Sequence, residues 1–475
     1  MTAPNPAPNP QASAVQEVEI SLYMDRQKIY PRSVQGVFSR WRWGLVWLTQ
    51  LIFYGVPWLE WNSRQAVLFD LEARRFYIFN LVLYPQDFIY LTGLLVISAL
   101  SLFLFTAVAG RLWCGYACPQ TVYTEMFLWI ENKVEGDRAA RMRLDQASMS
   151  WQKWGRKSLK HALWLAVGLW TGFTFVGYFT PIDALAQAVW QAALGPWQTF
   201  WVLFYGFATY GNAGFMREQV CKYMCPYARF QSAMFDKDTM IVTYDERRGE
   251  PRGARSKKAD PTALGLGSCV DCTLCVQVCP TGIDIRNGLQ YECIGCAACI
   301  DVCDQVMDKV GYPRGLIKYS TQNGMAQGWT VAEMMRRALR PRVLVYTGIL
   351  LAITVAVFAS LWMRVPLKVD VMRDRGSLAR LVDQGKVENV YRLQVMNATE
   401  QAQVYRLTVS GLPGIAVVSD ATVDVLPTEA RSVAVTVQIP PGPVSSGSHP
   451  IVFELVAEQD PAIRVAEKSV FIVPR

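Results

Sequence analysis

The sequence predicts a multi-domain membrane protein with an α-helical membrane part, a cysteine-rich insert and a C-terminal β-domain. Three observations predict this organisation. The 475 residues are 52% hydrophobic and only 18% charged, which is less charge than a soluble domain carries. Eight cysteines fall within residues 269–303, and alternating apolar residues begin only after residue 365. The length alone suggests about three domains.

Five apolar stretches are long enough to cross a bilayer. The chain begins with residues 1–42, of which 1–20 are rich in Pro, Asn and Ala, a composition typical of disorder, and no cleaved signal peptide is expected. Tryptophans near the ends of the stretches fit an aromatic belt, and glycines interrupt the fourth stretch. The expected spans are residues 43–61, 88–110, 161–180, 197–216 and 343–363.

The basic residues predict the orientation, because cytoplasmic connections of membrane proteins are rich in Lys and Arg. Eight basic residues lie between 133 and 160 and ten between 217 and 258, whereas the connection 181–196 has none. We therefore expect a multi-pass protein of the bacterial inner membrane whose segments 1–42, 111–160 and 217–342 are cytoplasmic. The C-terminal part, residues 364–475, is then periplasmic. The net charge of +8 is interpreted as membrane-flanking charge, so no nucleic-acid partner is expected.

The insert contains two copies of one cysteine spacing, and the first is followed by Pro280. This C-x2-C-x2-C-x3-C pattern is the bacterial signature for 4Fe-4S clusters, in which the fourth cysteine of each run binds the other cluster. A zinc ribbon needs two cysteine pairs rather than two quartets, and a disulfide framework needs an oxidising compartment. A two-cluster bacterial-type ferredoxin domain is therefore expected at about residues 260–310. One cluster is assigned to Cys269, Cys272, Cys275 and Cys303, and the other to Cys293, Cys296, Cys299 and Cys279.

A second cysteine pattern, C-x-Y-x-C-P, occurs twice outside the insert, after the second and fourth expected spans. An i, i+4 spacing places two thiols on one face of a helix, if the helix continues there. Each pair could hold one soft cation, and the two pairs together could form a four-thiol site of the kind that selects Cu(I). The alternative is that these cysteines are small buried residues. The residues concerned are Cys114, Cys118, Cys221 and Cys225.

Residues 364–475 differ in character from the rest of the chain. Apolar residues alternate in several short runs that Gly- and Pro-rich turns separate, and this pattern predicts an immunoglobulin-like β-sandwich. This part shows no catalytic constellation, so docking or assembly is its expected role. The runs are Tyr391-Leu393-Val395, Val433-Val435-Val437-Ile439 and Ile451-Phe453-Leu455.

Several runs of residues resemble the cytochrome c oxidase accessory protein family CcoG, also called FixG or RdxA. The resemblance is dense over residues 23–320, and over 365–475 it concerns architecture more than motifs. No cysteine departs from the family pattern. The similar runs are 113–122 (WCGYACPQTV), 129–131 (WIE), 135–138 (EGDR), 222–234 (KYMCPYARFQSAM), 248–252 (RGEPR), 279–293 (CPTGIDIRNGLQYEC) and 312–315 (YPRG).

The resemblance implies a membrane-bound iron–sulfur protein that reduces Cu(II) to Cu(I) for assembly of the cbb3-type cytochrome c oxidase. It implies a cupric reductase with an unknown cytoplasmic electron donor, in which Cys114, Cys118, Cys221 and Cys225 could bind the Cu(I) product. Its partners would be oxidase subunits or copper-delivery proteins. Two alternatives stay open. One is a polyferredoxin-type carrier between quinol, or a cytoplasmic donor, and another reductase. The other is a non-redox assembly scaffold, which cluster variants that still support oxidase assembly would favour.

Overall fold

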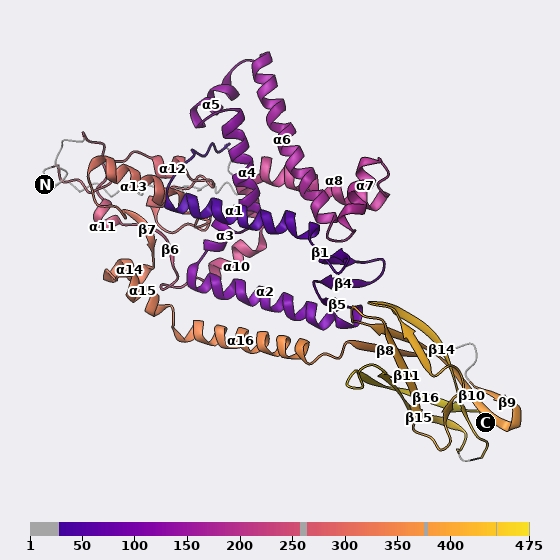
Figure 1. Cartoon of the computed structure of the whole chain (residues 1–475). Coiled ribbons are helices and arrows are strands. Elements are labelled where there is room, and N and C mark those ends of the chain that lie inside the picture. Colours follow the sequence, from indigo (N-terminus) through magenta and orange to yellow (C-terminus); the bar gives the residue numbers. More distant parts are fainter. Residues whose placement is uncertain (1–27, 257–263, 375–378, 443, 475) are drawn as a thin grey trace, which may run out of the picture.

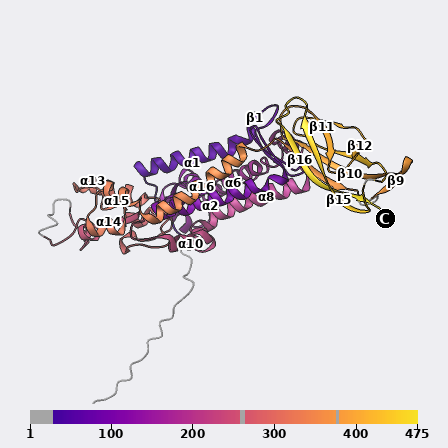
Figure 2. The same ribbon diagram turned by 90° about the horizontal axis from the view of Figure 1, so that it is seen from below.

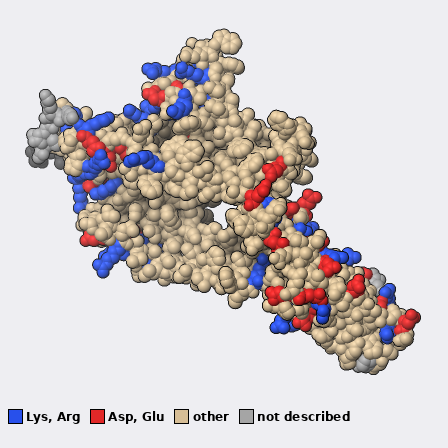
Figure 3. Space-filling view, in the orientation of Figure 1, with Lys and Arg blue, Asp and Glu red and all other residues tan. Residues whose placement is uncertain are grey.

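The computed structural model describes residues 28–256, 264–374, 379–442 and 444–474. The stretch 1–20, expected to be disordered, lies outside these residues. A layer of long helices forms the middle of the molecule, with the cysteine-rich domain at one end and the β-sandwich at the other (Figures 1 and 2). Charged side chains gather toward these ends, and the helical middle is largely uncharged on the face seen in Figure 3.

Five long helices run between the two ends: α1 (Val37–Gly55), α2 (Phe88–Ala109), α6 (Trp151–Val176), α8 (Pro196–Gly211) and α16 (Pro341–Trp362). Among the described residues, three helices are long and apolar enough to cross a membrane by themselves, at Pro85–Ala109, Trp151–Val176 and Pro341–Trp362. These three candidate membrane helices correspond to the second, third and fifth expected spans. The first and fourth expected spans correspond to α1 and α8, which do not meet that measure of length and hydropathy.

Three helix boundaries differ from those expected. Helix α6 begins ten residues before the expected span, because the Ser150 side chain caps it by accepting a hydrogen bond from the Lys153 amide. Helix α1 begins earlier than expected and ends at Gly55, followed by a short 3-10 turn, Val56–Trp58. Helix α8 gives way to a π-helical turn, Asn212–Met216, in the glycine-rich part of the fourth stretch.

Shorter helices and turns link the long ones at the cysteine-rich end. They carry the C-x-Y-x-C-P motifs and the basic segments on either side of them. They are α3 (Leu112–Tyr116), α4 (Pro119–Val134), α5 (Arg138–Gln146), α9 (Arg217–Gln219), a π-turn (Val220–Met224), α10 (Pro226–Met234), α14 (Gln322–Gln327) and α15 (Val331–Arg337). At the other end, α7 (Ile182–Trp190) joins α6 to α8.

The cysteine-rich domain is larger than the expected residues 260–310. It contains α11 (Glu246–Gly249), α12 (Leu274–Gln277) and α13 (Ala298–Val310). An antiparallel pair of strands, β6 (Ile241–Tyr244) and β7 (Ile317–Ser320), closes it, with Val242 opposite Tyr319. The domain therefore includes the segments before and after the cysteine region, because β6 precedes this region and β7 follows it.

The C-terminal domain is a sandwich of two antiparallel sheets, as the alternating residues predict. One sheet has the order β12-β14-β10-β8, with β9 also paired to β10, and the other has the order β13-β11-β15-β16. Tyr391, Leu393, Phe453 and Leu455 are fully buried between the sheets. The strands are β8 (Leu367–Arg373), β9 (Arg380–Val382), β10 (Lys386–Asn397), β11 (Gln403–Ser410), β12 (Ala416–Val417), β13 (Thr422–Val425), β14 (Ala430–Ile439), β15 (Gly447–Ala457) and β16 (Arg464–Val473).

The connection between α1 and α2 is an additional small β-structure. It consists of β1 (Glu60–Trp61), β2 (Arg64–Gln65), β3 (Val67–Asp70), β4 (Arg75–Ile78) and β5 (Leu81–Leu83). It packs against the sandwich: the Tyr84 hydroxyl donates to the backbone oxygen of Asn397, 2.9 Å away, and Arg64 is paired with Glu400. The buried Asp87 accepts from Arg364 at 2.6 Å. These contacts attach the sandwich to the helical layer.

Candidate metal centre

The four cysteines assigned to the first cluster line one cavity. Cys269, Cys272, Cys275 and Cys303 contribute to its wall together with apolar residues of β6, β7 and α13. Cys303 reaches it from α13, on the far side of the second cysteine run, as the crossed assignment requires. Burial and the neighbouring thiols of Cys275 and Cys269 raise the pKa of Cys303 to about 12. A set of four thiols converging on one cavity fits a 4Fe-4S cluster.

The second assigned quartet is also brought together. Burial raises the pKa of the Cys299 thiol well above the usual value, and the nearby thiols of Cys296, Cys293 and Cys279 raise it further. Burial likewise raises the pKa of Cys293 to about 12. Both α12 and α13 follow a residue in the left-handed conformation, Thr273 with φ 57° and Ala297 with φ 57°. The two halves of the cysteine region therefore repeat one local fold, as their spacing suggests.

The structure also gathers the two C-x-Y-x-C-P motifs. Burial raises the pKa of Cys221 to about 12, and the nearby thiols of Cys118, Cys114 and Cys225 contribute to this shift. Within each motif the helix does not continue across both cysteines: Cys118 and Cys225 are extended residues immediately before the prolines that start α4 and α10. The two cysteines of each motif therefore do not share one helix face, as their i, i+4 spacing suggested. A turn separates them, and the four thiols still lie near one another.

Two polar side chains hold this four-thiol site. The Gln231 amide lies 3.3 Å from the sulfur of Cys114 and can donate to it. The Arg111 guanidinium is buried, donates to the backbone oxygens of Tyr291 and Ala228, and lowers the pKa of the Cys114 and Cys221 thiols, although burial outweighs it. Arg111 therefore ties the cysteine-rich domain to α10 while it offers positive charge to the thiols. The sequence analysis did not single out either residue.

The four-thiol site lies beside the second quartet. Cys114, Cys221 and Cys299 pack against a hydrophobic cluster that contains Cys296. Gly115 lies against the backbone of Cys296, so closely that an added Cβ would be 2.8 Å from its Cα and nitrogen. Within the described part of the chain, no three His, Cys, Asp or Glu side chains are already arranged as a metal site. The cysteine thiols therefore lie near one another, but their sulfur–sulfur distances are not yet those of a metal site. A bound metal would set these distances.

The cysteine-rich domain is anchored to the helical layer by contacts that the sequence analysis missed. Helix α1 lacks a capping side chain of its own, and Asp301 of α13 accepts hydrogen bonds from the backbone N–H groups of Phe38 and Ser39 at 3.2 and 2.7 Å. The Arg32 N–H donates to the oxygen of Gln277 at 2.8 Å. The sequence did contain one signal of this cap. Gly36 precedes α1 and has no side chain that could cap the helix, so another element has to supply the hydrogen-bond acceptors.

A buried ion cluster fixes the helices behind the four-thiol site. Glu131 of α4 is paired with Arg141 at 2.8 Å and with Arg217 at 2.7 Å, and Lys160 is 3.9 Å away. Burial alone would raise the pKa of Glu131, but Arg217 and Arg141 lower it below its usual range. Arg217 lies one helical turn before Cys221. The cluster therefore sets the position of the second motif relative to α4, which follows the first.

Family models match three parts of the chain. A 4Fe-4S dicluster domain matches residues 216–322, and a 4Fe-4S binding domain matches residues 91–135, which include Cys114 and Cys118. The third model, an IG-like fold at the C-terminus of FixG described as a putative oxidoreductase, matches residues 357–474.

Three curated proteins are similar over most of the chain. Nitrogen fixation protein FixG of Rhizobium meliloti is 39% identical, covering 93% of this chain and 91% of its own. Protein RdxB of Cereibacter sphaeroides is 41% identical over 81% of this chain and 82% of its own, and protein RdxA of that organism is 39% identical over 79% and 81%. A crystal structure of a FixG-related protein from Vibrio parahaemolyticus is 32% identical over 22% of this chain and 95% of its own, with a TM-score of 0.21.

Proposed function

This chain belongs to the family of FixG, RdxA and RdxB, and from that premise we propose that it is a membrane-bound electron-transfer protein that reduces Cu(II) to Cu(I). The Cu(I) would serve assembly of a cbb3-type cytochrome c oxidase, which the resemblance implies. The match to a dicluster 4Fe-4S model supports iron–sulfur chemistry in the cysteine-rich domain. Oxidase subunits or copper-delivery proteins would receive the product.

The observation that carries this proposal is the contact between Gly115 and the backbone of Cys296. Cys296 is an assigned ligand of the second cluster, and Gly115 follows Cys114 of the four-thiol site. Electron transfer over so short a separation needs no further carrier. When bound, the two clusters supply single electrons, and each Cu(II) substrate takes up one electron to become Cu(I).

The donor set of the four-thiol site suits the product of that reaction. Cys114, Cys118, Cys221 and Cys225 offer soft thiolate ligands, which select Cu(I) over harder ions. Arg111 compensates part of the negative charge that four thiolates would gather, and Gln231 positions the sulfur of Cys114. The eight cysteines of the two quartets hold the clusters in the crossed arrangement.

A five-span topology is part of the proposal. Helices α1 and α8 run between the same two ends of the molecule as the three helices that are apolar enough to span a membrane alone. The excess of basic residues at the cysteine-rich end supports a cytoplasmic position for that end. The sandwich then lies in the periplasm.

A second candidate concerns the ligand of the four-thiol site. The 4Fe-4S binding model covers Cys114 and Cys118, which favours a third iron–sulfur cluster there. The protein would then be an electron carrier to another acceptor rather than a copper reductase.

The test replaces Cys114, Cys118, Cys221 and Cys225 by serine in anaerobically purified protein. We expect the variant to keep both clusters, with about eight iron atoms per chain, and to lose copper binding and the formation of Cu(I). Iron and copper analysis, the cluster absorption spectrum and a Cu(I)-specific chelator provide the readouts. Unchanged Cu(II) reduction would refute the thiol site. A wild type with about twelve iron atoms that falls to about eight in the variant would support the third cluster instead.

A further inference from the structure

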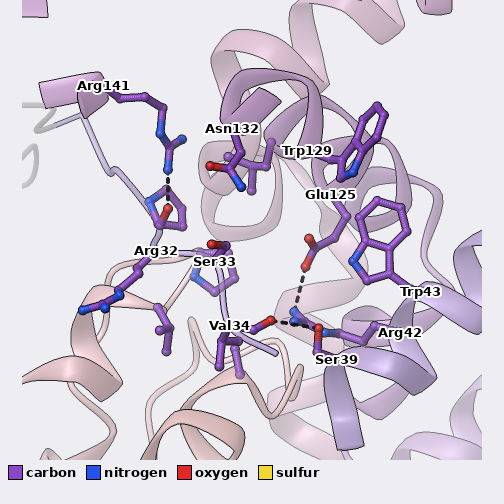
Figure 4. Close-up of a pocket in the computed structure, with 15 residues that line it drawn as sticks. Arg32, Ser33, Val34, Ser39, Arg42, Trp43, Glu125, Trp129, Asn132 and Arg141 are labelled. Atoms are coloured by element: carbon purple, nitrogen blue, oxygen red, sulfur yellow. Dashed lines mark hydrogen bonds and ion pairs between the residues drawn. The ribbon is translucent and has the colours of Figure 1, made fainter. Parts of the chain in front are cut away.

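A cavity separates the helical layer from the cysteine-rich domain beside the second quartet. It opens between residues 31–34, α1, α4 and the loops of that quartet (Figure 4). Pro280 and Ala298 form its wall on the domain side. Pro280 directly follows the assigned ligand Cys279, and Ala298 directly precedes Cys299. A molecule in this cavity would lie one residue away from two ligands of the same cluster.

The cavity combines aromatic walls with a few polar groups. Trp43 of α1 and Trp129 of α4 lie close together on one side, and Glu125, Arg42 and Asn132 face the interior (Figure 4). Trp129 is 51% exposed, at the end of the helical layer where tryptophans of membrane proteins meet the head-group region. This arrangement is typical of a site for a small planar molecule that enters from the membrane boundary.

The charges in the cavity do not favour an anion. Arg42 is 6% exposed and is paired with Glu125 at 2.7 Å. Arg141 is paired with Glu131 in the same way. The Arg42 Nε atom is nevertheless buried without a hydrogen-bond partner among the described residues. A neutral ligand with an oxygen acceptor satisfies that donor, whereas a phosphate would compete with carboxylates that already neutralise both arginines.

We infer that this cavity binds the head group of a membrane quinol, the reductant of the clusters. The inference rests on the proposed function, because it identifies the electron donor for the same cysteine-rich domain. The flat head group packs against Trp43 and Trp129. Its two oxygens meet Glu125 and Arg42 on one side and the Asn132 amide on the other, and its tail leaves past the exposed Trp129.

The proposed site accounts for the electrons and the protons that a quinol releases on oxidation. Oxidation of one quinol to the quinone breaks two O–H bonds and releases two electrons and two protons. Two 4Fe-4S clusters, when bound, would each take up one of these electrons, and Cys279 and Cys299 would hold the cluster nearer to the cavity. The Glu125 carboxylate accepts the protons in turn and passes them to solvent, with Arg42 holding it in place.

Two variants test the site in the full-length protein purified with its clusters. Asn132→Leu removes the amide at nearly constant size, and Ser33→Phe fills the cavity from its opposite wall. Asn80→Leu makes the same chemical change as Asn132→Leu at an exposed position near the sandwich and is the matched control. The probe is a photoreactive azidoquinone, with decylubiquinone as the competitor and peptide mass spectrometry as the readout. Iron content and the cluster spectrum report whether each variant is folded.

We expect decylubiquinone to suppress labelling of residues 33–43 and 125–132 in the wild type and in Asn80→Leu. In Asn132→Leu and Ser33→Phe, with full iron content, the competitor concentration needed should rise about tenfold or more, as expected for loss of one or more hydrogen bonds. Labelling elsewhere, or equal competition in all proteins, would overturn the inference. Dithionite serves as a separate donor. Clusters that dithionite reduces but decylubiquinol does not would refute the quinol site and leave the proposed electron-transfer function standing.

Discussion

At Gly115 the absence of a side chain lets α3 lie against the backbone of Cys296, the contact through which electrons would pass. Gly115→Ala would place a methyl group 2.8 Å from main-chain atoms that cannot turn away, so we expect a loss of about 1–3 kcal/mol in stability from overpacking. Cu(I) formation by the pre-reduced protein should slow as the two sites separate. Stopped-flow absorbance of the clusters and the thermal midpoint measure these effects.

Gly44→Ala is the control for that substitution. Gly44 is also helical, and an added Cβ there meets no atom within 4 Å. It should leave copper reduction unchanged and stabilise its helix by roughly 0.5–1 kcal/mol. Equal reduction rates in both variants would show that the Gly115 contact is not the electron path.

The crossed assignment makes a prediction at Cys303. Its thiol lies with those of Cys269, Cys272 and Cys275 rather than with the other cysteines of its own run. Cys303→Ser should therefore remove one cluster and lower iron from about eight to about four atoms per chain. Adding Cys269→Ser should remove no more iron, whereas adding Cys293→Ser should remove the second cluster as well, because residues that serve one site are not additive. Iron analysis of the two double variants provides the readout. If the Cys269→Ser addition removed the second cluster and the Cys293→Ser addition did not, the crossed ligand assignment would be refuted.

At the scale of elements, one carboxylate joins four helices. Glu131 of α4 is 3% exposed and pairs with Arg141 of α5, Arg217 of α9 and Lys160 of α6. Glu131→Gln would leave Arg141 and Arg217 without this counter-charge, whereas Lys160 keeps its pair with Glu135 at 3.0 Å. Removal of one partner of a buried ion pair costs about 3–5 kcal/mol. The thermal midpoint of the cluster-loaded protein should fall clearly. Glu246→Gln, at an exposed position, should change it little.

The same carboxylate predicts a dependence on pH. The pKa of Glu131 is lower in the folded protein than its usual 4.5, because Arg217 and Arg141 outweigh the effect of burial. Its contribution to stability is therefore fully present above pH 4.5 and is lost as the pH falls toward the lower folded pKa. The wild type should lose its advantage over Glu131→Gln in acid. A constant difference between the two at every pH would contradict the assignment of Glu131 as the charged centre of the cluster.

The sequence predicted those features that depend on residues close together in the chain. Cysteine spacing predicted the 4Fe-4S dicluster domain, and alternation located β10, β14 and β15 of the sandwich. The cap that Asp301 gives to α1 could not be predicted, because 262 residues separate it from Ser39 and only the tertiary fold brings them together. Strands β1–β5 were missed because each is two to four residues long, too short for a pattern. The predicted start of α6 was ten residues late. Residues 151–160 include basic side chains, so hydropathy left them out of the apolar span, although they are helical.

At the scale of the whole molecule, contacts at both ends of the helical layer show how often the chain traverses it. Ser39 and Arg111 contact the cysteine-rich domain, whereas Gln65 contacts Gly177 at the sandwich end. The chain therefore traverses the layer in α1 and returns in α2. Arg217 then meets Glu131 at the cysteine-rich end, so α6 and α8 form a second outward and return pair.

The fifth traverse is α16. Near its start, Arg340 donates to the Ala107 oxygen at 2.7 Å, and beyond its end Arg364 meets Asp87 at the sandwich end. Of the helices in the described part of the chain, only α2, α6 and α16 are apolar enough to span a membrane alone. A topology with these three crossings would place Cys118 and Cys221 on opposite sides of the bilayer. The thiol of Cys118 is near enough to raise the pKa of Cys221. These contacts support the proposal that α1 and α8 cross the membrane as well.

Fusions of alkaline phosphatase, which folds only where disulfides form, test this topology. We expect activity from fusions after Trp190 and after Arg475, and none from fusions after Gln146 and after Gly253. A fluorescent protein that matures in the cytoplasm should give the opposite pattern at each position. The fusion after Gln146 discriminates best, because three crossings with a cytoplasmic N-terminus would place it outside and five place it inside. Phosphatase activity there, or cytoplasmic fluorescence from the fusion after Arg475, would show that the five helices do not all cross.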